Sequence, residues 1–188
     1  MAGLQTPAPV GGVPGDVEVV RDFVNTTDHE TGSDDLTSTA ELTSYLHRAG
    51  LLTRRTASTP DDLSLARDLR QGLRHALELN HDGASESLPG LGRTLSRLSV
   101  QLSWAGNSVE LVPVCAGVPG ALARIALAMN RTVAAGTWWR LKICASHECE
   151  WAYYDNSKNR SRTWCEYGCG NRLKVRAYRE RQRANPAT

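Results

Sequence analysis

A regular pattern of apolar and polar positions predicts a short helix between residues 38 and 50. Ser38 followed by Glu41 is a capping box, in which each side chain accepts a backbone N–H near the helix start. Gly50 suits the left-handed backbone that often ends a helix. The residues recurring at helical spacing between these signals are Leu42, Tyr45, Leu46 and Ala49.

A second helix is predicted from Thr59 to about Asn80. Thr59 is a suitable cap, Pro60 occupies the first helical position, and two acidic residues follow in the first turn. An apolar stripe then follows along the helix. Its members are Leu65, Leu69, Leu73, Ala76 and Leu77.

Four further segments carry apolar patterns that predict secondary structure. Leucines at helical spacing predict a third helix over Leu88–Leu102, and Val109–Val114 reads as a short strand. A strongly apolar pattern over Pro119–Ala135 predicts the central helix of the body. The apolar residues between 17 and 25 fit either a short strand or a buried turn of helix.

The character of the chain changes after Gly136, where we place a domain boundary. Two short aromatic and β-branched strands are predicted, over Trp138–Ile143 and Glu150–Tyr154. A basic helix begins at Asn171. The change in composition indicates a small, separate C-terminal module.

Charge is distributed unevenly between these two parts. The formal net charge is +2, yet residues 138–188 hold 11 of the 22 Lys and Arg and only 5 of the 20 acidic residues, which makes this part +6 and the rest −4. A basic end on an acidic body is typical of a protein that binds a polyanion through that end. The opening stretch lacks the features of a signal peptide, and no apolar run is long enough for a membrane span, so we expect a cytoplasmic protein that does not bind membranes.

Four cysteines in the C-terminal module have the spacing of a metal site. They fall as C-x4-C, then fifteen residues, then C-x3-C. Two close pairs separated by a loop supply the tetrahedral ligand set of zinc, and in a reducing compartment clustered thiols favour metal over disulfide. One structural Zn²⁺ is therefore predicted, bound by Cys144, Cys149, Cys165 and Cys169.

Other interpretations of these cysteines are weaker. Disulfides require an oxidising compartment, and an iron–sulfur cluster also takes four thiolates, although the aromatic and basic surroundings favour zinc. His147 lies inside the first pair and could replace one cysteine. A catalytic zinc needs an open coordination position, which four cysteines do not leave, so the predicted site is structural.

Basic residues follow the last cysteine on one face of the predicted helix. Positions 172, 176, 179 and 183 are arginines at helical spacing, and a second basic group lies on the loop between the cysteine pairs. Arginine donates bidentately to phosphate or guanine, so both groups are candidates for nucleic-acid contact. A solvated charged tail is the alternative interpretation. The candidate residues are Lys158, Arg160, Arg162, Arg172, Lys174, Arg176, Arg179 and Arg183.

The predicted fold class is α+β, with a predominantly helical N-terminal domain and a small C-terminal zinc-binding module made of a short hairpin and the basic helix. The predicted divisions are a flexible leader over 1–15, a regulatory domain over 16–137, the zinc module over 138–183 and a tail over 184–188. Because so small a module has little core, zinc removal is expected to unfold it and leave the N-terminal domain largely intact.

Residues 140–183 resemble the CGNR zinc finger, a bacterial family named for the letters of Cys169–Arg172. The resemblance includes both cysteine pairs, the W-A-Y-Y-D run Trp151–Asp155, the S-K-N-R-S-R run Ser157–Arg162, and Trp164-Cys165; Tyr154 stands where the family often has Phe. The N-terminal part more loosely resembles a stress-induced transcription regulator domain, whose D-F-V-N-T-like run is here Asp22–Thr26. The resemblance implies a bacterial transcription regulator, with the finger on DNA and an N-terminal domain that senses a small-molecule ligand.

The leading functional hypothesis is binding of duplex DNA, with a homodimer or partner supplying additional interface because one short finger offers little. A protein-interaction module that docks on the transcription machinery is the first alternative. RNA binding is the second, with Trp151, Tyr153 and Tyr154 stacking on unpaired bases. No catalytic motif stands out, so an enzyme is not expected.

Overall fold

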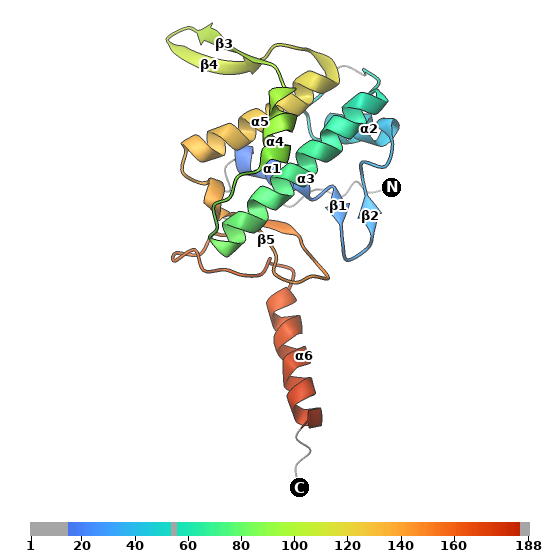
Figure 1. Ribbon diagram of the computed structural model, residues 1–188, viewed down its shortest axis with the longest axis vertical. Coiled ribbons are helices and arrows are strands. Elements are labelled where there is room, and N and C mark those ends of the chain that lie inside the picture. The colour runs from blue at the N-terminus through green and yellow to red at the C-terminus, as the bar shows by residue number, and fades with distance from the viewer. Residues whose placement is uncertain (1–14, 54–55, 185–188) are drawn as a thin grey trace.

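The computed structural model describes residues 15–53 and 56–184, which form a helical body from which one long helix projects (Figure 1). The helices are α1 Gly15–Val24, α2 Thr39–Arg48, α3 Pro60–Asp82, α4 Pro89–Ser96, α5 Gly117–Ala134 and α6 Cys169–Ala184, with a 3-10 turn over Trp138–Arg140. Three antiparallel hairpins join them: β1 Thr27–Asp28 with β2 Ser33–Asp34, β3 Val100–Ala105 with β4 Ser108–Pro113, and β5 Leu141–Ile143 with β6 Ala152–Tyr154. The predicted α+β class is confirmed.

The predicted helix starts are confirmed by their hydrogen bonds. The Ser38 hydroxyl accepts the Glu41 N–H at the start of α2. Thr59 and Asp62 form a reciprocal capping box on α3, with Pro60 in the first turn. These bonds satisfy N–H groups that have no partner inside the helix. Helix α3 ends at Gly83, whose φ of +66° a residue with a Cβ rarely adopts.

For two regions between residues 17 and 105, the secondary structure could be assigned only from the three-dimensional fold. The apolar run that fitted either a strand or a helix forms α1, which buries Val17, Val20 and Phe23. The prediction of one helix over Leu88–Leu102 is wrong in its second half, because α4 ends at Ser96 and β3 begins at Val100. From Leu98 to Trp104 the apolar residues also alternate as in a strand, and pairing with β4 satisfies the backbone of β3. The strand predicted over Val109–Val114 corresponds to β4 and the helix over Pro119–Ala135 to α5.

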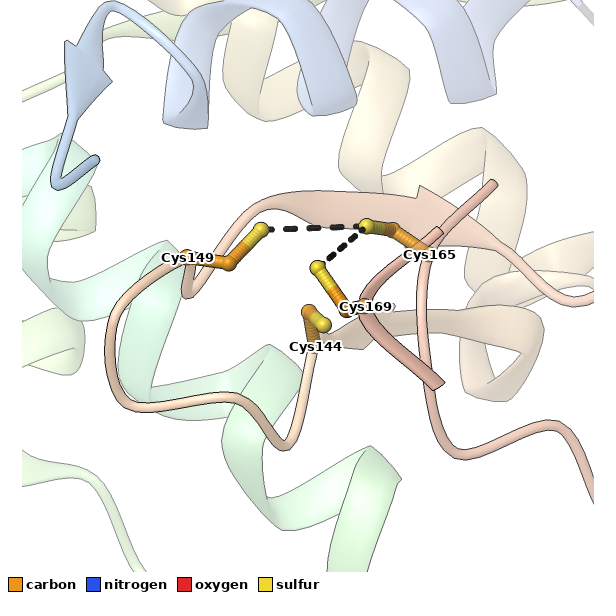
Figure 2. A group of neighbouring side chains, drawn as sticks. All are labelled: Cys144, Cys149, Cys165 and Cys169. Carbon is orange, nitrogen blue, oxygen red and sulfur yellow. Dashed lines mark hydrogen bonds between the residues drawn. The ribbon is translucent and has the colours of Figure 1, made fainter. Parts of the chain in front are cut away.

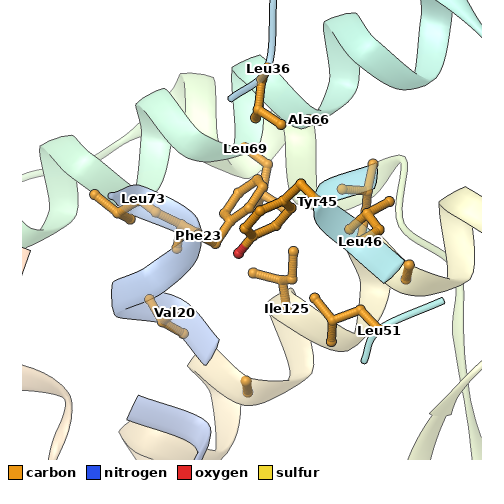
Figure 3. Packing of buried hydrophobic residues seen from close by; sticks show 14 of the residues in the cluster. Val20, Phe23, Leu36, Tyr45, Leu46, Leu51, Ala66, Leu69, Leu73 and Ile125 are labelled. Atoms are coloured by element: carbon orange, nitrogen blue, oxygen red, sulfur yellow. The ribbon is translucent and has the colours of Figure 1, made fainter. Parts of the chain in front are cut away.

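The main core lies where α1, α2, α3 and α5 meet (Figure 3). Phe23 of α1 packs against Tyr45 of α2 with ring centroids 5.9 Å apart. Leu69 of α3 and Ile125 of α5 are fully buried beside them. Burial of each such side chain contributes about 1.5–3 kcal/mol, so this core holds the helices in one arrangement.

The strands of the C-terminal module belong to the same core. Leu141, Ile143 and Ala152 are buried in the cluster formed by the helices, and β5 packs along α3. The side chain of Asn80 on α3 donates to the carbonyls of Trp138 and Leu141, each at 3.0 Å. The division at Gly136 stays a prediction, and the two parts it separates share apolar contacts and hydrogen bonds.

The described helices include none that is long and apolar enough to cross a membrane. The predicted leader lies outside the described residues except for Gly15, which begins α1. Of the predicted tail, residues 185–188 also lie outside them.

Candidate metal centre and basic helix

The four cysteines meet at one buried point (Figure 2). Their sulfur atoms all lie within 4.8 Å of one another, and the Sγ of Cys165 is 3.7 Å from that of Cys149 and 3.6 Å from that of Cys169. A zinc ion with bonds of about 2.3 Å to four sulfurs places neighbouring sulfurs about 3.8 Å apart. The cluster therefore fits one tetrahedral zinc, with all four ligands at most 5% exposed.

Each cysteine pair lies on a tight turn. In the first, the Ser146 carbonyl accepts the N–H groups of Cys149 and Glu150, and Glu150 has a φ of +46°. In the second, Gly168 has a φ of +81°, and its carbonyl accepts the N–H groups of Asn171 and Arg172 as α6 begins. The turns aim the sulfurs of both pairs inward.

Burial makes two of the metal-free thiols hard to ionise. It raises the pKa of Cys149 to about 11, and it also raises the pKa of Cys165. For Cys169, burial is outweighed by a hydrogen bond from Arg172 and by contacts with the other cysteines, so its pKa is lowered. Zinc binds cysteines as thiolates, so zinc binding releases protons from this site. The positive charge of the ion then balances the negative charge of the buried sulfurs. Four thiolates complete the coordination shell, which makes the site structural.

Arg172 connects the metal centre to the helical body. Its guanidinium donates to the Sγ of Cys169 at 3.1 Å and to the carboxylate of Glu30, in the loop between β1 and β2. A hydrogen bond to a metal-bound sulfur holds the ligand in place and stabilises its negative charge. Arg172 was predicted as a phosphate contact, and the structure gives it two protein partners.

A buried ion pair organises the loop between the cysteine pairs. The Lys142 ammonium lies 2.8 Å from the Asp155 carboxylate, and both side chains are at least nine-tenths buried. Lys142 also donates to the Arg160 carbonyl, and Asp155 accepts the N–H groups of Ser157 and Arg162. One ion pair therefore fixes the loop at both ends.

The loop's three basic side chains differ in their contacts. Lys158 is exposed and makes no ion pair among the described residues. The Arg160 guanidinium lies 3.6 Å from the centroid of the Trp139 ring, a cation–π arrangement. Arg162 donates to the Trp164 carbonyl and pairs with Glu166. Among the described residues, Lys158 is thus the one of the three whose charge has no such partner.

Helix α6 carries the remaining basic residues away from the body (Figure 1). It begins at Cys169, and Gly170 packs under Trp164, where a Cβ would lie 3.1 Å from the indole ring. Arg176 pairs with Glu148 and Glu180. Apart from Arg172 and Arg176, the basic residues of the helix form no ion pair within the part of the chain that the structure describes. They are Lys174, Arg179, Arg181 and Arg183.

The predicted arginine stripe is present on one side of α6. Arg172, Arg176, Arg179 and Arg183 border a shallow surface hollow along the helix together with Val175. The loop of residues 156–162 and the start of α6 lie at the same end of the molecule (Figure 1). The structure therefore brings the two predicted basic groups to one end.

Several residues that hold this arrangement were missed by sequence reasoning. Asn25 bonds the backbone of Ala152 through both ends of its amide, and Asn80 bonds the backbone before β5. Neither the Lys142–Asp155 pair nor Glu30 carried a sequence signal of its own. For Asn25, the one available indication of a role was its position in the D-F-V-N-T run.

Comparisons with known sequence families cover nearly all of the described chain. Residues 18–136 match the family described as a putative stress-induced transcription regulator. Residues 140–182 match the CGNR zinc finger. A search of curated proteins finds no match.

Proposed function

This chain belongs to the family of putative stress-induced transcription regulators and ends in a CGNR zinc finger, and on this premise we propose that it binds duplex DNA through α6 and the basic loop. The proposed role is regulatory rather than catalytic, since the four thiolates leave no open position on the metal. The observation that carries the proposal is a zinc-anchored helix whose exposed arginines and lysine extend beyond the body of the protein.

The charges on α6 support phosphate contact. Lys174, Arg179 and Arg183 have no acidic partner in the described residues, so binding a phosphate breaks no ion pair. The pairs that Arg176 makes are exposed on both sides and exchange readily with water. A helix with one basic face has the size and charge to enter the major groove.

The zinc site supplies a rigid base for the helix. Cys169 is both a zinc ligand and the first residue of α6, so the metal fixes the direction in which the helix leaves the body. Beyond this start, α6 packs extensively against none of the described helices or strands. An unsupported helix of this length is marginal in water, and phosphates that neutralise its arginines would stabilise it.

The two alternatives, docking on a protein and binding of RNA, depend on different side chains. Tyr178 and Val175 are 57% and 40% exposed on α6, and such side chains would suit docking on an acidic protein surface. For RNA, the predicted stacking residue Tyr153 is fully buried beside the cysteines and donates its hydroxyl to the Arg162 carbonyl. The burial of Tyr153 favours a packing role for it, and duplex DNA is the partner we propose.

A small-molecule ligand of the N-terminal domain is a further part of the proposal. A shallow hollow of about 560 Å³ lies between α3 and α4 and is lined in part by His75, Arg93 and Arg97. Its volume is within the range of small-ligand sites, and its basic groups would suit an anionic compound. Such a ligand would act on DNA binding through the contacts that α3 makes with the C-terminal module, such as those with β5.

The proposal is tested by fluorescence anisotropy with labelled genomic duplex fragments. Zinc-loaded protein is compared with chelated protein, and unlabelled duplex DNA, single-stranded RNA and an acidic polypeptide serve as competitors. We expect binding that requires zinc and is displaced best by duplex DNA. Displacement best by RNA or by the polypeptide would favour the corresponding alternative, and no binding by zinc-loaded protein at low salt would contradict the proposal.

A further inference from the structure

The hairpin of β3 and β4 has an apolar face that points to solvent. The strand register places Val100 opposite Pro113, Leu102 opposite Leu111, and Trp104 opposite Val109. Because side chains alternate across a strand, all six project from one face. Leu102 and Trp104 are 72% and 70% exposed, and the other valine and leucine side chains of this face are also exposed.

The opposite face of the hairpin is more polar. Its residues include Gln101 and Glu110, which are exposed, while Ser103 and Val112 are partly covered. A surface hairpin usually turns its apolar face to the core, whereas the apolar face of this hairpin is exposed to solvent. An exposed apolar face of this kind marks an interaction site.

The hairpin is held firmly where it joins the body. Gly120 in the first turn of α5 lets the preceding chain approach closely, since a Cβ there would lie 2.1 Å from the Cys115 carbonyl oxygen. Strand β4 packs along α5. Among the described strands, β3 and β4 pair only with each other, and a lone two-stranded hairpin is marginally stable in water.

We propose that this face binds the same face of a second copy of the chain. It carries no charged side chain, so it offers nothing to a polyanion or to a charged peptide. A face made of matched apolar cross-strand pairs is complementary in polarity to itself, as a two-fold interface requires. Two such hairpins can stack about 10 Å apart as a small sandwich, which buries both apolar faces.

The available area is sufficient for a dimer of modest affinity. The exposed side chains of the face present on the order of 500 Å² of apolar surface, near the upper end for the largest patch of a monomer. Two copies would bury about 1,000 Å² in total, which is the lower limit for a specific interface. We therefore expect dissociation in the micromolar range rather than an obligate dimer.

The location of the face is compatible with the function proposed above. The hairpin and α6 lie at opposite ends of the molecule (Figure 1). Self-association would therefore leave both basic helices accessible and give the assembly two of them. This consequence rests on the proposed function, whereas the dimer itself does not.

Sedimentation velocity of the zinc-loaded chain over a range of concentrations tests the proposal. Leu102→Glu places like charges against each other across the two-fold axis, and Gln101→Glu adds the same charge to the opposite face as a matched control. Circular dichroism checks that both variants are folded. We expect the wild type and Gln101→Glu to dimerise alike, and Leu102→Glu to raise the dissociation constant at least ~10-fold. A wild type that stays monomeric into the high micromolar range, or a dimer that Leu102→Glu leaves unchanged, would overturn the proposal. DNA binding is measured separately, so its failure is distinguishable from this result.

Discussion

The side-chain amide of Asn25 makes two hydrogen bonds with the backbone of Ala152, 127 positions further along the chain. Its nitrogen donates to the Ala152 carbonyl at 2.9 Å, and its oxygen accepts the Ala152 N–H at 2.8 Å. The amide thus donates to and accepts from the backbone of β6, as a residue of a neighbouring strand would. Ala152 lies between Trp151 and the buried Tyr153. Through this one side chain, the end of α1 is bonded directly to the zinc module.

Replacing Asn25 with Ala should destabilise the protein by roughly 1–3 kcal/mol, because the buried N–H and carbonyl of Ala152 lose their partner together. Urea unfolding of the zinc-loaded protein measures the change. Asn156→Ala, at an exposed asparagine in the basic loop, is the control and should stay within about 0.5 kcal/mol of the wild type. An equal effect of both variants would show that the Asn25 bonds carry little stability.

The Lys142–Asp155 pair should give the protein an acid-sensitive term. Burial by itself raises the pKa of Asp155, but hydrogen bonds from Lys142 and Ser157 outweigh it, and the pKa lies below its ordinary value. The corresponding stability is fully present above the unfolded-state pKa of about 3.9 and is lost as the pH falls through the lower folded-state pKa. Asp155→Asn should cost up to roughly 3–5 kcal/mol at neutral pH, because it leaves Lys142 buried without a counter-charge.

Urea unfolding as a function of pH measures this term. Acid also protonates the zinc thiolates, so the informative quantity is the difference in stability between the wild type and Asp155→Asn. This difference in stability should shrink as the pH drops below about 3.9, the pKa of Asp155 in the unfolded state. Asp82→Asn, at the exposed end of α3, serves as the control. A difference that does not change with pH would argue against an ionised Asp155 in the folded protein.

Zinc removal should unfold only part of the C-terminal module. The cysteines form their own buried cluster with Tyr153, Trp151 and Trp164, separate from the main core that holds β5. We expect chelation to increase amide hydrogen exchange over residues 144–184 and to leave α3 and α5 protected. Loss of protection throughout the chain in one step would show that the zinc site and the core fold as a single unit.

Arg172 should affect zinc affinity as well as DNA binding. Its hydrogen bond to the Cys169 sulfur stabilises the bound thiolate, and loss of such a contact typically weakens metal binding 10–100-fold, so we expect about a 10-fold loss for Arg172→Ala. Arg176→Ala lies one turn further along α6, away from the sulfur, and should leave zinc affinity unchanged. Competition with a chromophoric chelator measures both. If Arg172→Ala lowers only DNA affinity, then its main partner is phosphate.

Features that depend on residues close together in the sequence could mostly be predicted, whereas few contacts between distant residues could. The helix starts at Ser38 and Thr59 were readable because capping depends on residues three positions apart. The cysteine cluster was readable because its spacing reflects two turns. The end of α4 was missed because Leu98 and Leu102 fit both the helical stripe and the alternation of a strand, and only pairing with β4 decides between them.

The contacts that position the basic surface could not be predicted in this way. Glu30 meets Arg172 across 142 positions of sequence, and Arg74 on α3 donates to the carbonyl of Glu150 across 76. Such pairs depend on the packing of α1 and α3 against the hairpin of β5 and β6. The basic character of α6 was evident from composition, while its projection from the body depends on these packing contacts.

The central claim is that the free basic residues of α6 contact DNA phosphates. The most direct measurement is the salt dependence of duplex DNA affinity for the wild type, for Arg179→Gln/Arg183→Gln, and for Arg48→Gln/Arg131→Gln, which removes the same charge from exposed sites on the N-terminal domain. Each lost phosphate contact should reduce the slope of log affinity against log salt by about 1. We predict a slope smaller by about 2 for the α6 variant and an unchanged slope for the control. Equal slopes for all three proteins would contradict the claim that this helix contacts DNA.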